Sequence, residues 1–226
     1  MQKAVRVLNY ILMVLAMACL VYYIHTGGLW LKGVTSSWFV LLGLVNFVFA
    51  KRSGVKKMGF LAVLEGALVL CMTADVCLGL NFLLGTAVFA LGHVCFFAAF
   101  CILEKPRHGD WIPIGITLVI SLIAVLGTPY IQIEDPLMRG ILVAYAVVIS
   151  AMLGKAIGNL MAKRSLSRWL FAIGSVMFWF SDLMLALNLF GSGGRLAGLL
   201  CMYTYWPGQS LIAHTLYHYA VEEREP

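Results

Sequence analysis

Charged side chains are scarce in this chain. Asp, Glu, Lys and Arg make up only 12% of its 226 residues, whereas 62% are hydrophobic. Soluble domains contain about a quarter charged and about half apolar residues. The shortage of charge excludes an ordinary soluble fold and predicts a polytopic membrane protein, with residues 1–226 forming a single transmembrane domain. The net charge of +6 does not indicate nucleic-acid binding, because the basic residues gather at segment ends rather than on one face.

Several signatures of catalysis and of metal binding are also missing. The chain has no G-x-S-x-G elbow, no H-E-x-x-H pair, no Walker loop and no G-x-G-x-x-G turn. Its six cysteines lie in apolar runs and form no C-x-x-C pair, so we expect free thiols. His214 and His218 have the i, i+4 spacing of a chelating pair, but no third ligand lies near them in the sequence. We therefore expect no metal site and no cofactor.

Long apolar runs are what the chain has in abundance. A helix needs about 20 mostly apolar residues to cross a bilayer. By that measure the sequence predicts an all-α bundle of about eight transmembrane helices. The expected spans are Ala4–Ile24, Ser36–Ala50, Met58–Leu80, Phe82–Leu103, Trp111–Gly127, Leu137–Leu160, Trp169–Phe190 and Leu196–Ala220. Almost nothing separates the third span from the fourth, which predicts a tight antiparallel hairpin.

The basic residues predict the orientation of the bundle. If the N-terminus is inside, the inner segments hold twelve Lys and Arg residues, whereas the outer loops hold only Lys32, Arg139 and Arg195. This bias places both termini in the cytoplasm, and we expect the membrane to be a bacterial cytoplasmic membrane. Lys155 is the one basic residue well inside a span. It lies a little over a turn from the inner end, and we expect its side chain to snorkel to the interface.

Two carboxylates stand inside apolar spans, and both begin the pattern D-x-x-L-x-L-N. The first copy runs from Asp75 to Asn81 in the third span, and the second from Asp182 to Asn188 in the seventh. A charge within hydrocarbon costs at least a few kcal/mol, so such residues are functional candidates by default. The repeated pattern also suggests a four-plus-four duplication, although coincidence is an alternative because leucine is common in membrane spans.

Other polar residues lie at similar depth. At a rise of about 1.5 Å per residue, both aspartates fall in the outer half of the membrane. Counted from the outer ends of their spans, His93 lies about 16 Å, Tyr205 about 14 Å and Gln209 about 20 Å along. We expect these five side chains to converge on one polar cavity. One carboxylic acid and one carboxylate would then provide general acid and base. The alternative is that both aspartates only join helices through hydrogen bonds.

Four blocks of sequence resemble one family of membrane proteins, the YhhN family. The blocks are Leu64–Leu78, with its D-x-x-L pattern; Phe82, Gly85, Phe89 and His93; Phe180–Ala186, with its S-D-x-x-L-A pattern; and Tyr205, Gln209, Leu211 and Ile212. They occur in order over spans three, four, seven and eight. The chain departs from the family at Ala74, at Phe96 and Phe97, and at Pro207 and Gly208, and its second expected span lacks the lysine that the family leads us to expect there.

The resemblance implies an activity, because the family includes lysoplasmalogenases, which hydrolyse the vinyl ether bond of lysoplasmalogens. It implies Asp75 and Asp182 as the catalytic pair, a lysophospholipid as substrate and membrane lipids as surroundings. The alkenyl tail would lie between helices, with the phosphate head toward a basic residue or an interfacial amide. The residues that we expect to bind or orient the substrate are His93, Tyr205, Gln209, Ser181, Asn81, Asn188 and Glu65.

Two other functions remain open from the residues alone. The same aspartates would serve a lipid-binding protein or a proton-coupled transporter as proton or cation sites. A two-aspartate intramembrane protease is a weaker hypothesis, because neither aspartate stands in a G-x-G-D setting. Glu65, ten residues before Asp75, would either extend the polar lining or bond to a neighbouring helix. The oligomeric state has no signal in the sequence.

Overall fold

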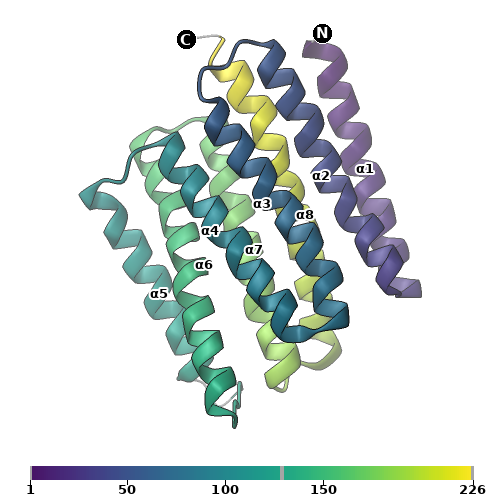
Figure 1. The fold of residues 1–226 in the computed structure, drawn as a ribbon, viewed down its shortest axis with the longest axis vertical. Helices are drawn as coiled ribbons and strands as arrows, with labels where there is room; N and C mark the ends of the chain where they lie inside the picture. The colour runs from purple at the N-terminus through teal and green to yellow at the C-terminus, as the bar shows by residue number, and fades with distance from the viewer. Residues whose placement is uncertain (1, 128–129, 225–226) are drawn as a thin grey trace.

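The computed structural model describes residues 2–127 and 130–224, which fold into eight α-helices packed in one bundle (Figure 1). The all-α fold that the sequence predicts is confirmed. Both chain ends lie at one end of the bundle, here called the termini end. The helices are α1 (Gln2–Thr26), α2 (Leu29–Arg52), α3 (Met58–Leu80), α4 (Phe82–Leu103), α5 (Trp111–Leu126), α6 (Pro136–Ala162), α7 (Leu166–Phe190) and α8 (Gly194–Glu222).

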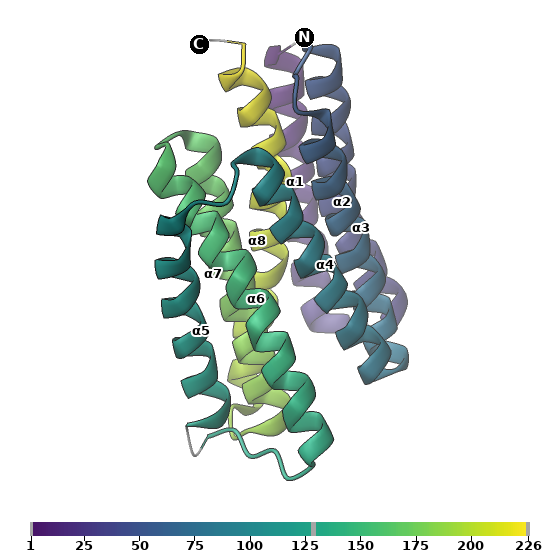
Figure 2. The ribbon, with the colours of Figure 1, turned by 60° about the vertical axis from the view of Figure 1, so that its left-hand side comes forward.

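Length and composition explain why these elements are membrane helices. Within the described residues, α1 to α7 are long and apolar enough to span a bilayer, the fifth together with the short 3-10 turn His108–Asp110. In hydrocarbon a helix satisfies its backbone hydrogen bonds internally, so apolar runs of this length fold as helices. α8 is less apolar and carries many buried polar side chains. It packs between α7 and α2 and also contacts α1 and α3, as Figures 1 and 2 show.

The second helix begins earlier than the sequence predicts. The expected span started at Ser36, but α2 begins at Leu29, only two residues after α1 ends. Those two residues are Gly27 and Gly28, with φ of 69° and 99°. A glycine adopts positive φ without a steric penalty, so the chain reverses in a very short turn. Lys32 therefore lies inside α2 rather than in an outer loop. The prediction that the second span lacks a lysine is wrong.

The tight hairpin between α3 and α4 is confirmed. Asn81 alone joins the two helices, and its side-chain Oδ1 accepts a hydrogen bond from the backbone N–H of Leu84 at 2.9 Å. This contact caps α4 in the usual way for an asparagine at a helix N-terminus. Gly85 lies so close to the backbone of Leu78 that any Cβ at this position would overlap it. The hairpin fixes how far the polar residues of α3 and α4 are offset along the bundle.

The packing pairs consecutive helices. α3 packs on α4, α7 on α8, α5 on α6 and α1 on α2, while α2–α8 and α4–α6 contacts join these pairs. α3 and α7, which carry the two aspartates, do not pack against each other but both lie beside α8. A four-plus-four duplication stays a prediction.

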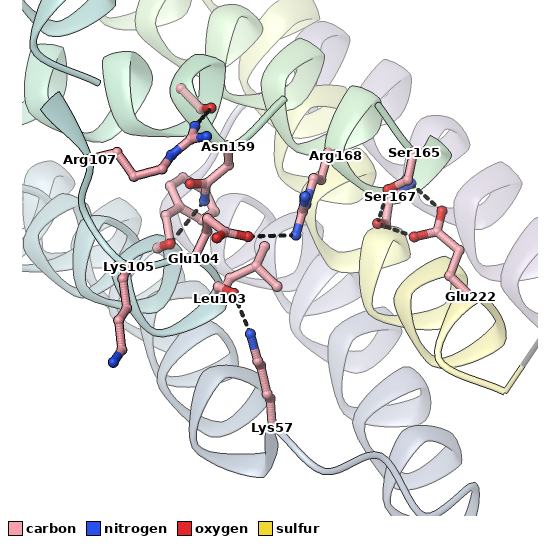
Figure 3. A network of polar contacts seen from close by, with 12 residues as sticks. Lys57, Leu103, Glu104, Lys105, Arg107, Asn159, Ser165, Ser167, Arg168 and Glu222 are labelled. Carbon is pink, nitrogen blue, oxygen red and sulfur yellow. Dashed lines mark hydrogen bonds and ion pairs between the residues drawn. The ribbon is translucent and has the colours of Figure 1, made fainter. Parts of the chain in front are cut away.

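Polar contacts tie the helices together at the termini end (Figure 3). The Nζ of Lys57 donates to the carbonyl of Leu103 at 2.5 Å, and a guanidinium nitrogen of Arg168 donates to Glu104 at 3.1 Å. Glu222, near the end of α8, accepts from both the backbone N–H and the hydroxyl of Ser167. These contacts connect α3, α4, α7 and α8 at the termini end. Asp75 and Asp182 lie in the halves of α3 and α7 that are further from this end.

Lys155 does not snorkel, contrary to the expectation from its sequence position. Its Nζ donates to the carboxylate of Asp110 at 2.6 Å, and both side chains are almost completely buried. The ammonium also donates to the carbonyl of Lys105, while Arg107 approaches the other oxygen of Asp110. The carboxylate that comes before α5 therefore provides a buried partner, which is why the long side chain stays inside.

Removal of one member of this buried pair should destabilise the bundle strongly. We expect Asp110→Ala to lower the free energy of unfolding by about 3–5 kcal/mol, because it leaves a buried ammonium without its counter-charge. Thermal unfolding of the purified protein in detergent measures the effect. Lys105→Met is the control, since that side chain is exposed and we expect it to change stability by less than about 0.5 kcal/mol. Equal melting temperatures for both variants would contradict a stabilising role of the pair.

Candidate active site

Asp75 lies in a pocket of donors near the end of α3. Its Oδ2 accepts hydrogen bonds from the hydroxyl of Ser36 at 2.6 Å and from the hydroxyl of Tyr205 at 2.8 Å. The Nζ of Lys32 lies 3.4 Å from Oδ1. The indole N–H of Trp206 donates to the hydroxyl of Ser36 and so holds it in position. Two hydroxyl donors and an ammonium complement a negatively charged carboxylate, which is otherwise only 2% exposed.

Asp182 has a different set of partners. The hydroxyl of Tyr145 donates to its Oδ2 at 2.6 Å, and Nε2 of His93 lies 3.1 Å from the same oxygen. Nε2 of His93 is also 2.8 Å from the Tyr145 hydroxyl, so the three groups form a closed triangle. His93 is fully buried, and its Nδ1 faces the sulfur of Met152. No lysine or arginine contacts Asp182 among the described residues, and its side chain is 12% exposed.

The two carboxylates line one cavity of about 190 Å³, here called the carboxylate cavity. It lies between α1, α2, α3, α4, α7 and α8. Lys32 and Tyr205 line the same cavity, together with apolar side chains such as Phe89. α3 and α7 approach it from different sides, which explains how two helices that do not touch bring their acids to one space. Of the five side chains expected to converge on one cavity, Asp75, Asp182 and Tyr205 line it, whereas His93 and Gln209 do not.

A second, apolar cavity adjoins the first. It has a volume of about 70 Å³, lies between α3, α4, α5, α6 and α7, and is lined mainly by leucine, valine and phenylalanine side chains. Leu78, Phe89, Asp182 and Leu185 line both cavities. Asp182 thus lies where the apolar cavity meets the cavity that contains both carboxylates. Such a junction suits an amphiphile whose reactive bond lies between an apolar tail and a polar head.

The predicted site residues divide into two groups. His93 and Tyr205 contact the aspartates directly, and Asn188 lines the carboxylate cavity at its edge. Ser181 is buried and donates mainly to the carbonyl of Phe178, at 2.6 Å, with Asp182 Oδ1 at 3.4 Å.

The other three predicted binding residues lie elsewhere. Asn81 is exposed and caps α4. Gln209 is fully buried beside the thiol of Cys71 and lines neither the cavity with the two aspartates nor the apolar cavity. Glu65 packs against Gly43 of α2. Its Oε2 has no hydrogen-bond partner in the part of the chain that the structure describes, so neither expected role of this residue is seen.

Sequence reasoning missed Lys32, Ser36 and Tyr145. Lys32 was assigned to a loop, although the apolar residues Leu29 to Leu31 just before it are a signal that the helix starts earlier. Ser36 was taken as the first residue of a span rather than as a donor to an acid 39 positions away. Tyr145 lies in an apolar span with no neighbouring motif, and nothing in the sequence alone singles it out.

The histidines at the termini end do not form a larger cluster. Nε2 of His214 and Nε2 of His218 are 3.1 Å apart. In residues 2–127 and 130–224 no group of three or more His, Cys, Asp or Glu side chains is placed to hold a metal ion. The six cysteines are free.

Comparison with known proteins identifies the family of this chain. The model of the YhhN family matches residues 35–216, which include both aspartates, His93, Tyr145 and Tyr205. The chain belongs to the YhhN family. It is also similar to lysoplasmalogenase TMEM86B of Sus scrofa, at 29% identity over 208 residues, covering 86% of this chain and 81% of that protein. The Homo sapiens protein of the same name is 29% identical over 210 residues, with 87% and 81% covered. No solved structure matches the chain.

Family membership and the seven long apolar helices together make this an integral membrane protein. Assignment to a bacterial cytoplasmic membrane, with both termini inside, stays a prediction.

Proposed function

We propose that this YhhN-family protein is an intramembrane hydrolase that cleaves the vinyl ether bond of lysoplasmalogens. The observation that carries the proposal is the placement of Asp75 and Asp182 in one cavity, with Asp182 also lining the apolar cavity. The similarity to proteins named lysoplasmalogenase supports the same substrate class. The products are a fatty aldehyde and a glycerophospho-alcohol.

The first step requires an acid at the alkene. Asp182, protonated, transfers its proton to the vinyl carbon beyond the one bonded to oxygen, and the electron pair of the double bond forms the new C–H bond. The remaining carbon and the ether oxygen then share a positive charge as an oxocarbenium ion. With the chain in the apolar cavity, the alkene lies beside Asp182, the acidic residue among the four that line both cavities. His93 and Tyr145 contact the carboxyl directly and are placed to return a proton to it.

The second step requires a negative charge and a base. Asp75, held as a carboxylate by Lys32, Ser36 and Tyr205, stabilises the oxocarbenium ion and accepts a proton from the attacking water. Water adds to the positive carbon and gives a hemiacetal. The hemiacetal hydroxyl then gives its proton to the Asp182 carboxylate, and its carbon becomes an aldehyde as the bond to the glycerol oxygen breaks. The glycerol oxygen takes the proton held by Asp75, so both aspartates return to their starting states. Paired acid and carboxylate groups with this division of work also cleave glycosides through oxocarbenium-like transition states.

The direct test is aldehyde release by purified protein in lipid vesicles. We expect a lysoplasmalogen to give free aldehyde and the glycerophospho-alcohol in equal amounts. A lysophospholipid with a saturated ether or an ester should give no cleavage, because neither has an alkene to protonate. Absence of aldehyde from folded protein, together with proton-dependent uptake that requires both aspartates, would replace this proposal with transport.

Tyr145→Phe should slow the hydrolysis without unfolding the protein. The change removes the hydroxyl that donates to Asp182 and keeps the ring in place. As Asp182 gives up its proton, its carboxylate becomes charged, and the Tyr145 hydroxyl stabilises that charge. A hydrogen bond to a charged group contributes about 1.5–3 kcal/mol, so we expect kcat to fall about tenfold to a hundredfold. Tyr22→Phe is the matched control, because that side chain is exposed at the bundle surface. Full activity of Tyr145→Phe would show that the hydroxyl has no part in the reaction.

A further inference from the structure

A third hollow lies at the end of the bundle opposite the chain termini. It has a volume of about 400 Å³ and is formed where the end of α1, the end of α7 and the beginning of α8 meet. Asn188, Gly198 and Met202 line both this hollow and the carboxylate cavity, so the two spaces adjoin. The residues that line the hollow are Ile24, His25, Asn188, Arg195, Gly198, Leu199, Met202 and Tyr203.

The polar side chains of this hollow suit an anion. It contains Arg195 and His25 and no carboxylate. Arg139, the other arginine near this end of the bundle, donates to the carbonyl of Ile133. In contrast, neither Arg195 nor His25 makes a hydrogen bond or ion pair within residues 2–127 and 130–224. An arginine with a free planar fork is well suited to the oxygens of a phosphate.

The three spaces follow one another in the order of the parts of a single-chain phospholipid. The apolar cavity comes first and meets the carboxylate cavity at Asp182. The carboxylate cavity, with Lys32 and Asp75, then adjoins the hollow with Arg195 and His25. A lysolipid has a tail, then the bond to the chain, then glycerol, then phosphate.

We propose, on the basis of the proposed function, that this hollow is the head-group subsite, where Arg195 and His25 bind the phosphodiester of the lysolipid. The subsite selects a phosphate-bearing head group and sets how deeply the alkenyl chain of the lipid enters the apolar cavity. It also gives the site its direction, because the head group enters and leaves at the end of the bundle opposite the termini. With the predicted orientation of the helices, that end is the outer face of the membrane.

Binding of a ligand that cannot be cleaved tests the subsite apart from catalysis. The probes are a saturated 1-O-alkyl lysophosphoethanolamine and the corresponding 1-O-alkylglycerol, which lacks the phosphate. Binding to the full chain in lipid nanodiscs is measured by calorimetry against empty discs. We expect Arg195→Gln to weaken binding of the phosphate-bearing probe about tenfold and to change binding of the alkylglycerol by less than about twofold. Arg195→Lys should restore most of the loss, because it keeps the charge.

Arg139→Gln is the matched control, since this second arginine near the same end lines a different hollow. It should leave both affinities unchanged. The proposal is overturned by equal losses for the two probes, by no loss for either, or by inorganic phosphate competing as strongly as the lysolipid. If the selective loss is observed but no lysoplasmalogen is hydrolysed, the proposed function fails and the head-group subsite stands.

Discussion

Replacement of Asp182 by asparagine should lower the rate of aldehyde release from a lysoplasmalogen by about 10²–10⁴-fold, the range typical of a lost general acid. The asparagine oxygen still accepts the hydrogen bond from Tyr145, so the helix packing has no reason to change. What the variant loses is the acidic proton that the vinyl carbon must receive. Measured with purified protein in vesicles, kcat should fall while the melting temperature stays within a few degrees of the unchanged protein.

Glu65→Gln is the control for this effect. Glu65 is another carboxyl group within a membrane helix, but it packs against Gly43 and lines neither of the cavities that contain Asp182. We expect its amide variant to retain nearly full activity. Comparable losses in the Asp182 and Glu65 variants would mean that the amide substitutions act through the general properties of the bundle, and Asp182 would lose its assignment as the acid.

Replacement of Asp75 by asparagine should also reduce turnover by about 10²-fold or more, through loss of the negative charge beside the oxocarbenium ion. Lys32→Met should produce a smaller loss, because it leaves the carboxylate in place but removes the ammonium 3.4 Å away. If the lysine acts through Asp75, the double variant should be no slower than Asp75→Asn alone. Groups that work as a unit give such non-additive effects, and a double-mutant cycle on kcat measures the coupling.

Additive losses would overturn this pairing. They would indicate that Lys32 contributes to the reaction independently of the carboxylate. The hydroxyl donors provide a further comparison, since Ser36→Ala removes one hydrogen bond to Asp75 and keeps the ion pair. Its effect on kcat should be smaller than that of Asp75→Asn.

The membrane fold was predictable from the sequence because it depends on composition over long windows. Runs such as Met58–Leu80 have no other stable structure in hydrocarbon, where each backbone polar group needs a partner within the segment. The start of α2 was not predictable by the same rule. Its first turn contains Lys32, which lowers the hydropathy of the window, and the helix exists there because two glycines allow an immediate reversal after α1.

The acids of the candidate site were predictable, whereas most of their partners were not. Asp75 and Asp182 stand out because ionisable groups are expensive within a bilayer. Tyr145 and Ser36 are ordinary residues of membrane helices, and their role depends on which helices become neighbours. The pairing of Lys155 with Asp110 has the same origin, because it joins the last third of α6 to a turn 45 positions earlier. Such long-range contacts are set by tertiary packing and leave no local pattern.

For the proposed hydrolysis, the position of Asp182 between the apolar cavity and the carboxylate cavity, which adjoins the hollow with Arg195, has a consequence after bond cleavage. The two fragments partition into different phases. The aldehyde dissolves in the surrounding lipid, while the phosphorylated glycerol diffuses into water. Since the fragments no longer share a solvent, they do not meet again at useful concentration, and recombination is suppressed without any moving gate.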